Sequence, residues 1–385
     1  MNPSLSSAQV DPSFSERMGL AVRSHRPTGP RVLNLGMDWG TGCSRLLGSR
    51  ENEDSIDFRL TSPTCVGYAK DGIVENLLPG NARVVFGKEA IRHRLHLQRV
   101  QPIRQGRVAE PKAAHEFAQF LRAQLGADDA DELRVVVGIP SACSASDRQA
   151  FRHALTGVFD AVLLVPKPFL AALGYRDESQ LQDSDYVDPA SNSIFVDLGA
   201  GTTDVCLVQG AYPAADEQVS IELAGDELDQ RLSDRIRQSY PESNISLLKV
   251  RELKEQFAYV GEAKQPAIAE LCIQGKLTKV DLTQMMGECC RELLQQVFAA
   301  IVQLVSKADS ESVPELIQHI FLTGGGSRIR SIDWELTKLL WDAGLEGAQV
   351  RVADENDEGW IALGALKASR RARLDQWQRL SSEVE

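Results

Sequence analysis

Two segments of this chain combine an aspartate with a glycine-rich turn, and each follows a run of apolar residues. The segments are Asp38-Trp-Gly-Thr-Gly-Cys-Ser44 and Asp197-Leu-Gly-Ala-Gly-Thr-Thr203. Successive backbone N–H groups in such a turn form a concave anion site. The aspartate repels an anion but suits Mg²⁺ or its bound waters. Two such turns facing each other would hold a polyphosphate from both sides, whereas either turn alone could be a simple tight β-hairpin.

A third glycine-rich turn, Gly324-Gly325-Gly326-Ser327, follows the apolar run at 320–323. Glycine lets the backbone approach a ligand closely. We expect this turn to open a helix whose N-terminus favours anions. The predicted contacts to the bound molecule are Gly40, Thr41, Gly42, Cys43 and Ser44 in the first turn, Gly199, Ala200, Gly201, Thr202 and Thr203 in the second, and Gly324 to Ser327 in the third.

Several other function classes lack support in the sequence. The GxxxxGK[ST] motif of P-loop NTPases does not occur, and no GxGxxG of a dinucleotide-binding Rossmann domain follows a strand-like segment. The motifs GxSxG and HExxH are also missing from the sequence. The 42 basic and 54 acidic residues give a net charge of -12, which disfavours nucleic-acid binding. The seven cysteines form no CxxC pair, so we interpret them as reduced thiols rather than a zinc site.

Strand and helix patterns alternate along most of the chain, which indicates an α/β architecture. Strands are predicted at 31–37, 133–139, 162–165 and 320–323, with helices at 111–126, from 146, and at 358–379. Residues 193–208 are predicted to form a strand, a glycine turn and a second strand. Residues 225–306 are expected to be largely helical, and 177–192 to form an acidic loop. No apolar run reaches the roughly 18 residues of a membrane helix, so no integral membrane segment is expected. The similarity between 37–44 and 196–203 predicts two lobes that open with the same turn.

These motifs, in this order and spacing, resemble the actin, heat-shock-70 and sugar-kinase ATPase superfamily over about residues 31–370. The resemblance implies a two-lobed α/β ATPase fold, in which each lobe has a mixed sheet flanked by helices and a smaller inserted subdomain. It implies a flexible tail at 1–30, a first lobe at 31–190 with an insertion at about 60–110, a second lobe at 191–350 with a helical insertion at about 226–290, and a C-terminal helix at 351–385 that returns to the first lobe. ATP or ADP would lie between the lobes, with Mg²⁺ positioned by Asp38 and Asp197.

Finer features are similar to bacterial actins. The segments Glu222-Leu-Ala-Gly-Asp-Glu-Leu-Asp229 and Leu253-Lys-Glu-Gln-Phe-Ala-Tyr-Val260 resemble actin segments near the nucleoside. By this resemblance Gly225 contacts the nucleotide, Lys254 the base and Glu255 the ribose. An exposed helical charge pair is the alternative for the last two.

The stretches VDLGAGTTD, DEQV, LKEQF and GGGSRIR are most similar to magnetosome filament actins, and next to cell-shape actins. The resemblance implies a cytoplasmic, cytoskeletal ATPase that forms ATP-dependent homopolymers and positions organelles. Its partners would be further copies of itself and organelle- or membrane-associated adaptor proteins. An ATP-binding adaptor of the FtsA or PilM type and a small-molecule kinase are the alternatives.

Two positions bear on hydrolysis. Asp147 occupies the place of a carboxylate that polarises the attacking water in cell-shape actins, but it also suits the first turn of a helix. Many superfamily members carry Glu where this chain has Lys167 before Pro168. A protonated lysine cannot act as that base, so we expect slow hydrolysis or hydrolysis supported by Asp147 alone. Lys167 would pair with phosphate or with Asp147.

Overall fold

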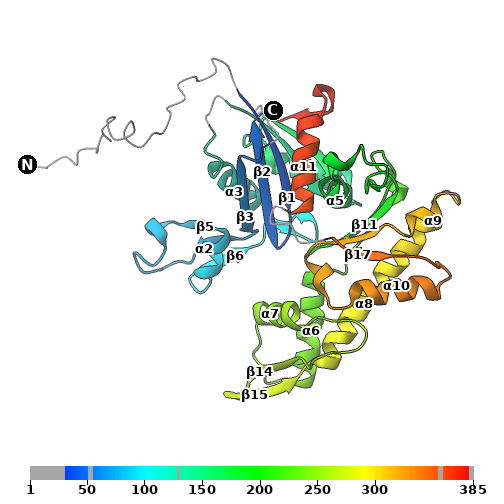
Figure 1. The fold of residues 1–385 in the computed structure, drawn as a ribbon. Helices are drawn as coiled ribbons and strands as arrows, with labels where there is room; N and C mark the ends of the chain where they lie inside the picture. The colour runs from blue at the N-terminus through cyan, green and yellow to red at the C-terminus, as the bar shows by residue number, and fades with distance from the viewer. Residues whose placement is uncertain (1–30, 51–54, 128–130, 354–358, 381–385) are drawn as a thin grey trace, which may run out of the picture.

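The computed structural model of the 385-residue chain describes residues 31–50, 55–127, 131–353 and 359–380. Two large β-sheets with flanking helices make up most of it (Figure 1). The tail predicted at 1–30 lies outside the described residues. Residues 354–358 and 381–385 of the C-terminal helix predicted at 351–385 lie outside them as well.

The first sheet has six strands in the order β18-β10-β9-β1-β2-β3. Its strands are β1 (Val32–Trp39), β2 (Cys43–Arg50), β3 (Phe58–Pro63), β9 (Glu132–Ile139), β10 (Ala161–Pro166) and β18 (Gln378–Arg379). β1, β9 and β10 run parallel, whereas β1, β2 and β3 form an antiparallel meander. The predicted strands at 133–139 and 162–165 are confirmed as the central part of this sheet.

The second sheet repeats this arrangement with five strands in the order β13-β12-β11-β16-β17. Its strands are β11 (Ser193–Leu198), β12 (Thr203–Val208), β13 (Gln218–Ile221), β16 (Ile320–Thr323) and β17 (Val350–Val352). Again one strand, β11, pairs antiparallel with the next strand in the chain and parallel with a distant one. The internal repeat predicted from the two turns is therefore present in the strand order of both sheets.

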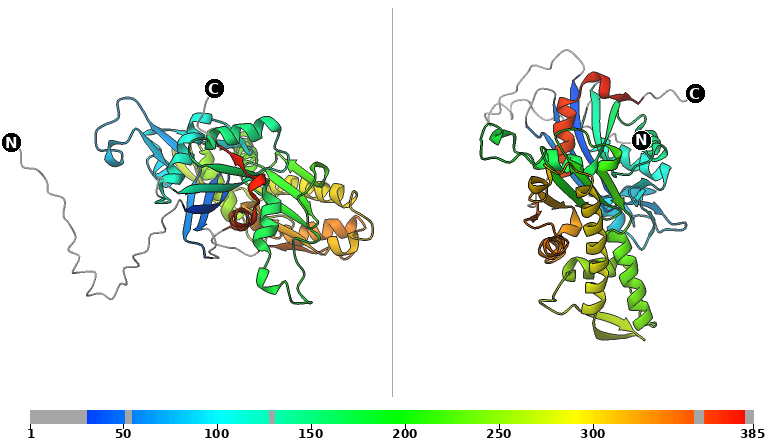
Figure 2. Two further views of the ribbon diagram at one scale, coloured as in Figure 1. Left: turned by 90° about the horizontal axis from the view of Figure 1, so that it is seen from above. Right: turned by 90° about the vertical axis from the view of Figure 1, so that its right-hand side faces the viewer.

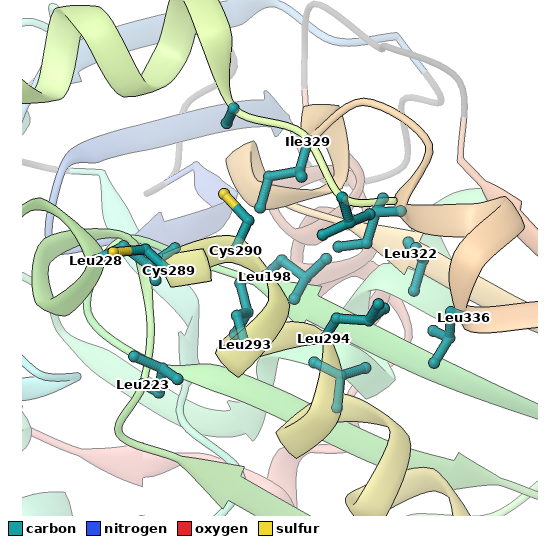
Figure 3. Close-up of a cluster of buried hydrophobic side chains, with 14 of the residues drawn as sticks. Leu198, Leu223, Leu228, Cys289, Cys290, Leu293, Leu294, Leu322, Ile329 and Leu336 are labelled. Atoms are coloured by element: carbon teal, nitrogen blue, oxygen red, sulfur yellow. The ribbon is translucent and has the colours of Figure 1, made fainter. Parts of the chain in front are cut away.

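Helices cover both outer faces and fill the space between the sheets. α3 (Pro111–Ala123) and α4 (Ala145–Leu155) pack on one face of the first sheet; α6 (Gly225–Ser239), α7 (Leu247–Phe257), α8 (Thr283–Val305) and α10 (Ile332–Asp342) pack around the second; α9 (Val313–Leu316) is short. Figure 3 shows part of the second core, where Leu198 lies beside Cys290 and Leu293 of α8. None of the helices in the described ranges is both long and apolar enough to span a bilayer.

The layer between the sheets consists of α5 (Lys167–Tyr175) and α11 (Trp360–Arg371). Alternate residues of β9 point to opposite faces of the sheet. Val135 and Val137 pack against α3 and α4, whereas Val136 packs with Leu170 of α5 and Ala365 of α11. The same inner cluster includes Phe195, Cys206 and Phe321 of the second sheet. α5 therefore contacts both sheets, and α11 packs against α5 and the first sheet.

Two smaller units extend from the lobes. The first contains β4 (Val66–Ala69), β5 (Val84–Phe86), α2 (Gly87–Arg92) and β6 (Leu97–Val100), followed by the hairpin of β7 (Ile103–Arg104) and β8 (Arg107–Val108). In the second, α6 and α8 run side by side toward a hairpin at the tip (Figures 1 and 2). That hairpin consists of β14 (Ile268–Ile273) and β15 (Lys276–Asp281).

The prediction that this second insertion is largely helical was therefore wrong at its tip. Along β14, Ala269 and Leu271 are buried while Ile268 and Glu270 are exposed, which is the two-residue period of a strand. Gln274 and Gly275 both have positive φ, of 51° and 77°, as the turn of a two-residue hairpin requires. A Gln-Gly turn between two alternating segments was the signal in the sequence.

The C-terminal helix is shorter than predicted. α11 ends at Arg371, well before the expected end at Arg379. The chain then forms β18, which pairs antiparallel with β10 through Ala161 and Val162. The chain forms this strand instead of continuing the helix because β10 would otherwise be an unpaired sheet edge.

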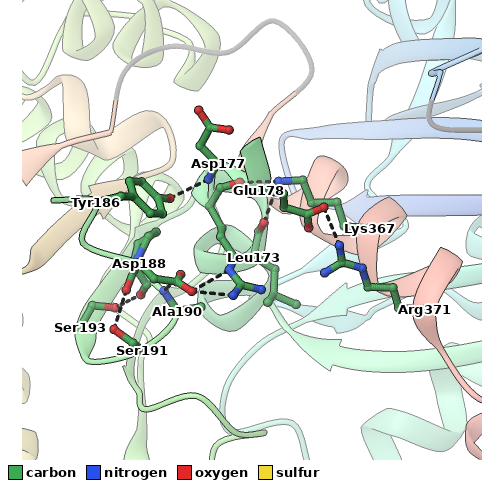
Figure 4. A network of polar contacts seen from close by, with 12 residues as sticks. Leu173, Asp177, Glu178, Tyr186, Asp188, Ala190, Ser191, Ser193, Lys367 and Arg371 are labelled. Atoms are coloured by element: carbon green, nitrogen blue, oxygen red, sulfur yellow. Dashed lines mark hydrogen bonds and ion pairs between the residues drawn. The ribbon is translucent and has the colours of Figure 1, made fainter. Parts of the chain in front are cut away.

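α5 and α11 approach each other closely because glycines face each other at their contact. A Cβ atom placed on Gly364 would lie 1.8 Å from the carbonyl oxygen of Leu170, and one on Gly174 would lie 1.9 Å from that of Trp360. Lys367 of α11 donates hydrogen bonds to the carbonyls of Leu173, Gly174 and Arg176 at the end of α5, at 3.1, 3.2 and 2.6 Å (Figure 4). Its ammonium thus caps the C-terminus of α5.

We expect Gly364→Ala and Gly174→Ala to destabilise the protein, although alanine is the better helix former. The added methyl group has no room against backbone, so each should lower the free energy of unfolding by about 1–3 kcal/mol. Chemical denaturation would measure this, with Gly325→Ala as the control, because a Cβ there meets nothing within 4 Å. An unchanged midpoint in both helix variants would contradict the close packing.

Candidate functional site

The two predicted glycine turns lie at equivalent places in the two sheets. The first connects β1 to β2, and the second connects β11 to β12. Asp38 is aligned with Gly138 of the neighbouring parallel strand, and Asp197 is aligned with Thr323. Each aspartate therefore lies at the carboxyl end of a central strand, where α/β sheets commonly bind ligands.

The tips of the two turns contact each other. A Cβ atom placed on Gly42 would lie 3.3 Å from the Cβ of Ala200, and one on Gly201 would lie 2.1 Å from Oγ1 of Thr41. The turns thus face each other at van der Waals distance, and a side chain at Gly201 would force them apart. The positions of the two turns in the sequence could not by themselves have shown that they touch.

The third turn reaches the same place from β16. Gly324 has φ of 78°, and a Cβ atom there would lie 2.6 Å from Oδ1 of Asp197. At Gly326 it would lie 2.8 Å from the Cβ of Leu198. Ser327 is buried and donates to the Gly324 carbonyl at 2.7 Å, which closes the turn on itself.

The expected anion-binding helix N-terminus after this turn is not formed. Gly325–Arg328 is a single turn of 3₁₀ helix, and α10 begins only at Ile332. One 3₁₀ turn aligns too few peptide dipoles to create an appreciable field. The third turn can therefore offer a ligand only the close approach of its backbone, which its glycines permit.

Lys167 lies at the centre of the site, where the sequence had left its partner open. Its Nζ is 2.9 Å from Oδ1 of Asp38, and their side chains are only 11% and 12% exposed. It therefore pairs with Asp38, rather than with Asp147 as considered above. Burial by itself lowers the pKa of Lys167, but the carboxylates of Asp38 and Asp197 outweigh it and raise that pKa above the ordinary lysine value.

Two more buried carboxylates share this environment. Burial raises the pKa of Asp197 to about 7, even though Lys167 acts in the opposite direction. Burial also raises the pKa of Asp204, which accepts hydrogen bonds from the Ser141 N–H at 2.8 Å and the Thr202 hydroxyl at 2.7 Å. Asp204 ties the second turn to the segment after β9.

Lys167 and Asp204 complete this charged group. Asp204 was not among the predicted contacts, whereas Lys167 was predicted to pair with phosphate or with Asp147. Asp204 closes the run VDLGAGTTD, so its place in the motif was an available signal. For Lys167 the signal was its position before Pro168, at the first residue of a helix that follows a buried strand. The identity of its partner required the fold.

Two further predicted hydroxyl donors are engaged inside the protein, in addition to those of Thr202 and Ser327. Ser44 is fully buried and shares a 2.7 Å hydrogen bond with the hydroxyl of Thr64. The Thr203 hydroxyl, also fully buried, donates to the Leu223 carbonyl at 3.0 Å. Both residues lie in strands, whose side chains alternate between faces, and this alternation turns their hydroxyls into the protein. The expectation that these hydroxyls contact phosphate is corrected accordingly.

Cys43 is half-buried, and burial raises the pKa of its thiol. A thiol held in its neutral form is a weak hydrogen-bond donor and a poor nucleophile. Its side chain therefore adds little to the first turn beyond packing.

The residues predicted to contact the nucleoside gather at the start of α6. Lys254 donates to the Gly225 carbonyl at 2.6 Å and forms an ion pair with Asp229 at 2.7 Å. A Cβ atom placed on Gly225 would lie 3.2 Å from the Cα of Ala200, so this corner adjoins the second turn. Glu255, the next residue on α7, is exposed.

Asp147 lies in the first turn of α4 and forms a capping box with Ser144. The Asp147 N–H donates to the Ser144 hydroxyl at 3.1 Å, and that hydroxyl donates to Asp147 Oδ2 at 2.6 Å. Arg107 is 3.7 Å from the same oxygen. This is the second of the two roles that the sequence allowed. Activation of water by Asp147 remains a prediction.

The arrangement suits an anionic ligand at the glycine turns better than it suits Mg²⁺ bound to Asp38 and Asp197. Asp38 Oδ1, one of the two oxygens of this carboxylate that could hold a hard cation, already contacts the buried ammonium of Lys167. Arg45 lies 4.0 Å from the other oxygen, Oδ2. The pair Asp38 and Asp197 therefore does not fit the expected metal site, whereas the glycine turns remain well placed for phosphate.

Comparison with known proteins places these features in a family. Residues 63–374 match the family described as MreB/Mbl protein. The actin-like protein MamK of Magnetospirillum gryphiswaldense is 32% identical over 307 residues, which is 78% of this chain and 79% of that protein. MamK of Paramagnetospirillum magneticum is 30% identical over 355 residues, covering 90% and 95%. The cell shape-determining protein MreB of Haemophilus influenzae is 26% identical over 325 residues, covering 79% and 86%.

Solved structures agree with the sequence matches. A subunit of the MamK double helical filament superposes with a TM-score of 0.79 at 27% identity, covering 89% of this chain and all 100% of that one. A non-polymerising MamK mutant bound to AMPPNP superposes with a TM-score of 0.63 at 26% identity, covering 89% and 99%. The fold is therefore actin-like, and this chain belongs to the MreB/Mbl family of actin-like proteins.

Proposed function

We propose that this protein binds ATP and ADP between its two lobes and assembles into nucleotide-dependent filaments. The observation that carries the proposal is the pair of facing glycine turns at equivalent ends of two equivalent sheets. Support comes from relatives: one matched structure is a MamK filament, and another MamK binds AMPPNP. The proposed lobes are residues 31–190 and 191–350.

The turns would hold the phosphates mainly through backbone. The N–H groups of the first turn, residues 40–44, would donate from one lobe and those of the second, 200–203, from the other. The Gly199 N–H already donates to the Thr202 carbonyl at 3.0 Å and closes the second turn. Gly225, Lys254 and Glu255 would contact the nucleoside together with Gly324, Gly325, Gly326 and Ser327. Mg²⁺ at Asp38 is left out of this proposal because Lys167 holds that carboxylate.

Hydrolysis of ATP by such a site is an in-line transfer of the γ-phosphoryl group to water. Positioning and electrostatic stabilisation supply most of the rate. Asp147 is the candidate for polarising the water, but it also serves the α4 cap and faces Arg107. The ammonium of Lys167 already carries its proton, so it cannot accept one from the water. We therefore propose slow turnover.

Filament growth would follow from a preference of the ATP-bound form for the polymer. ATP can shift that equilibrium only as far as its affinities for the two forms differ. The resemblance to magnetosome filament actins suggests a cytoplasmic scaffold that aligns and positions magnetosomes, attached through organelle- or membrane-associated adaptor proteins. A cell-shape role of the MreB kind is the related alternative.

One observation favours a second candidate function. The buried ion pair of Lys167 with Asp38 would suit a protein that binds ATP without hydrolysing it. Such a protein would act as an adaptor of the FtsA or PilM type and recruit partners in its ATP-bound form. Measuring assembly and phosphate release in one sample separates the two candidates.

We expect the wild-type chain to sediment after addition of ATP, and to release phosphate slowly in the same tube. Asp197→Ala should prevent sedimentation, because Asp197 is buried beneath the second and third turns and shapes both. Asp185→Ala is the matched control, since Asp185 is exposed on the acidic loop.

If nothing sediments with any nucleotide over a range of salt concentrations, the filament proposal is wrong. Sedimentation without phosphate release would instead leave a polymer that binds ATP but does not turn it over. The Asp197→Ala result counts only when circular dichroism shows a folded variant.

We also expect Lys167→Glu to increase phosphate release per assembled subunit by about tenfold or more, since a positioned general base typically contributes about 10²–10⁴-fold. Lys167→Gln is the control, because it removes the charge without adding a base. A folded Lys167→Glu variant that releases phosphate at the wild-type rate would show that Lys167 is not what limits hydrolysis.

A further inference from the structure

We propose that Lys167 is a built-in cation of the nucleotide site, which takes the place of a divalent metal beside Asp38. The protein would then bind ATP with little dependence on Mg²⁺. This inference rests on the proposed function, because it assumes that a nucleotide binds between the two turns.

The backbone and the packing around Lys167 fix the position of its ammonium. Lys167 is the first residue of α5 and directly follows β10, with Pro166 before it and Pro168 after it. Proline on both sides restricts the backbone at this junction. A Cβ atom placed on Gly138 of β9 would lie 3.1 Å from Cγ of Lys167, so the aliphatic stem packs against that strand. Only 9% of the residue is exposed.

The ammonium also occupies the position that a metal bound to Asp38 Oδ1 would need. Its distance of 2.9 Å from Asp38 Oδ1 is that of a direct ion pair. A divalent cation bound to the same oxygen would lie within a few ångströms of a fixed positive charge. Repulsion between the two would be strong in so buried a place. Mg²⁺ and Lys167 are therefore alternatives at Asp38.

The charges around the site need one such cation. Asp38, Asp197 and Asp204 are 8%, 4% and 0% exposed. Two cations lie close to Asp38 in the described part of the chain, Lys167 and the partly exposed Arg45 at 4.0 Å. A polyphosphate would add further negative charge. A divalent metal normally neutralises that charge in nucleotide sites, and here Lys167 is in place to do so.

Lys167 lies next to the first glycine turn. A Cβ atom placed on Gly40 would lie 3.8 Å from Nζ of Lys167. A lysine ammonium is a compact point charge with three hydrogen-bond donors. The ammonium lies 2.9 Å from Asp38 Oδ1 as an ion pair, and its N–H donors remain for phosphate oxygens held by the turn. The lysine can thus link the aspartate to the phosphate, as a metal ion and its waters would.

The test is the equilibrium affinity of the full chain for AMPPNP, measured by isothermal titration calorimetry with excess Mg²⁺ or with excess EDTA. For the wild type we expect removal of Mg²⁺ to weaken binding by less than about threefold, below the tenfold step that corresponds to 1.4 kcal/mol. In Lys167→Glu, removal of Mg²⁺ should weaken binding by about thirtyfold or more, because an added carboxylate then needs a metal beside it. Lys276→Glu, at an exposed lysine of β15, should behave as the wild type.

Each outcome decides the proposal. Wild-type binding that falls about thirtyfold or more without Mg²⁺ would overturn it while leaving nucleotide binding intact. No wild-type binding under either condition would overturn the proposed function as well. Lys167→Glu places like charges together and can fail to fold, so Lys167→Gln and the double variant Asp38→Asn/Lys167→Gln accompany it. The wild-type comparison needs no variant and is sufficient to reject the proposal.

Discussion

The placement of α5 is the constraint on which the rest of the molecule depends. Its residues touch the first sheet at Val136 and the second at Phe195, so this one helix lies in contact with both lobes. Close contact with α11 through Gly174 and Gly364 leaves it little freedom to move. Because Lys167 is the first residue of α5, the packing that joins the sheets also places an ammonium beside Asp38.

Buried charge is the second organising feature. Ionised groups are costly to remove from water unless they are paired and hydrogen-bonded. Here Asp38 pairs with Lys167, and Asp204 accepts hydrogen bonds from Ser141 and Thr202. Removing one partner of a buried ion pair typically costs about 3–5 kcal/mol, more than the pair itself contributes. Single changes among these paired groups are therefore expected to be poorly tolerated.

The relatives illustrate how a fold persists while the sequence diverges. At 27% identity the chain superposes on a MamK filament subunit with a TM-score of 0.79. The two sheets and the helices between them are conserved as a shape because their apolar contacts accept many side chains. A site depends on individual charges, so its chemistry can differ between proteins that share a strand order.

The sequence by itself determined the local features of this protein. Asp-x-Gly-x-Gly turns after apolar strands, the repeat of the two lobes and the helix at 111–123 were all predictable, because each depends on neighbouring residues or on a simple period. Tertiary structure decided the partner of Lys167, the inward direction of the Ser44 and Thr203 hydroxyls, and the pairing of β18 with β10. These depend on which strands lie adjacent and in what register. Adjacency and register are set by the packing of the whole chain rather than by any segment of it.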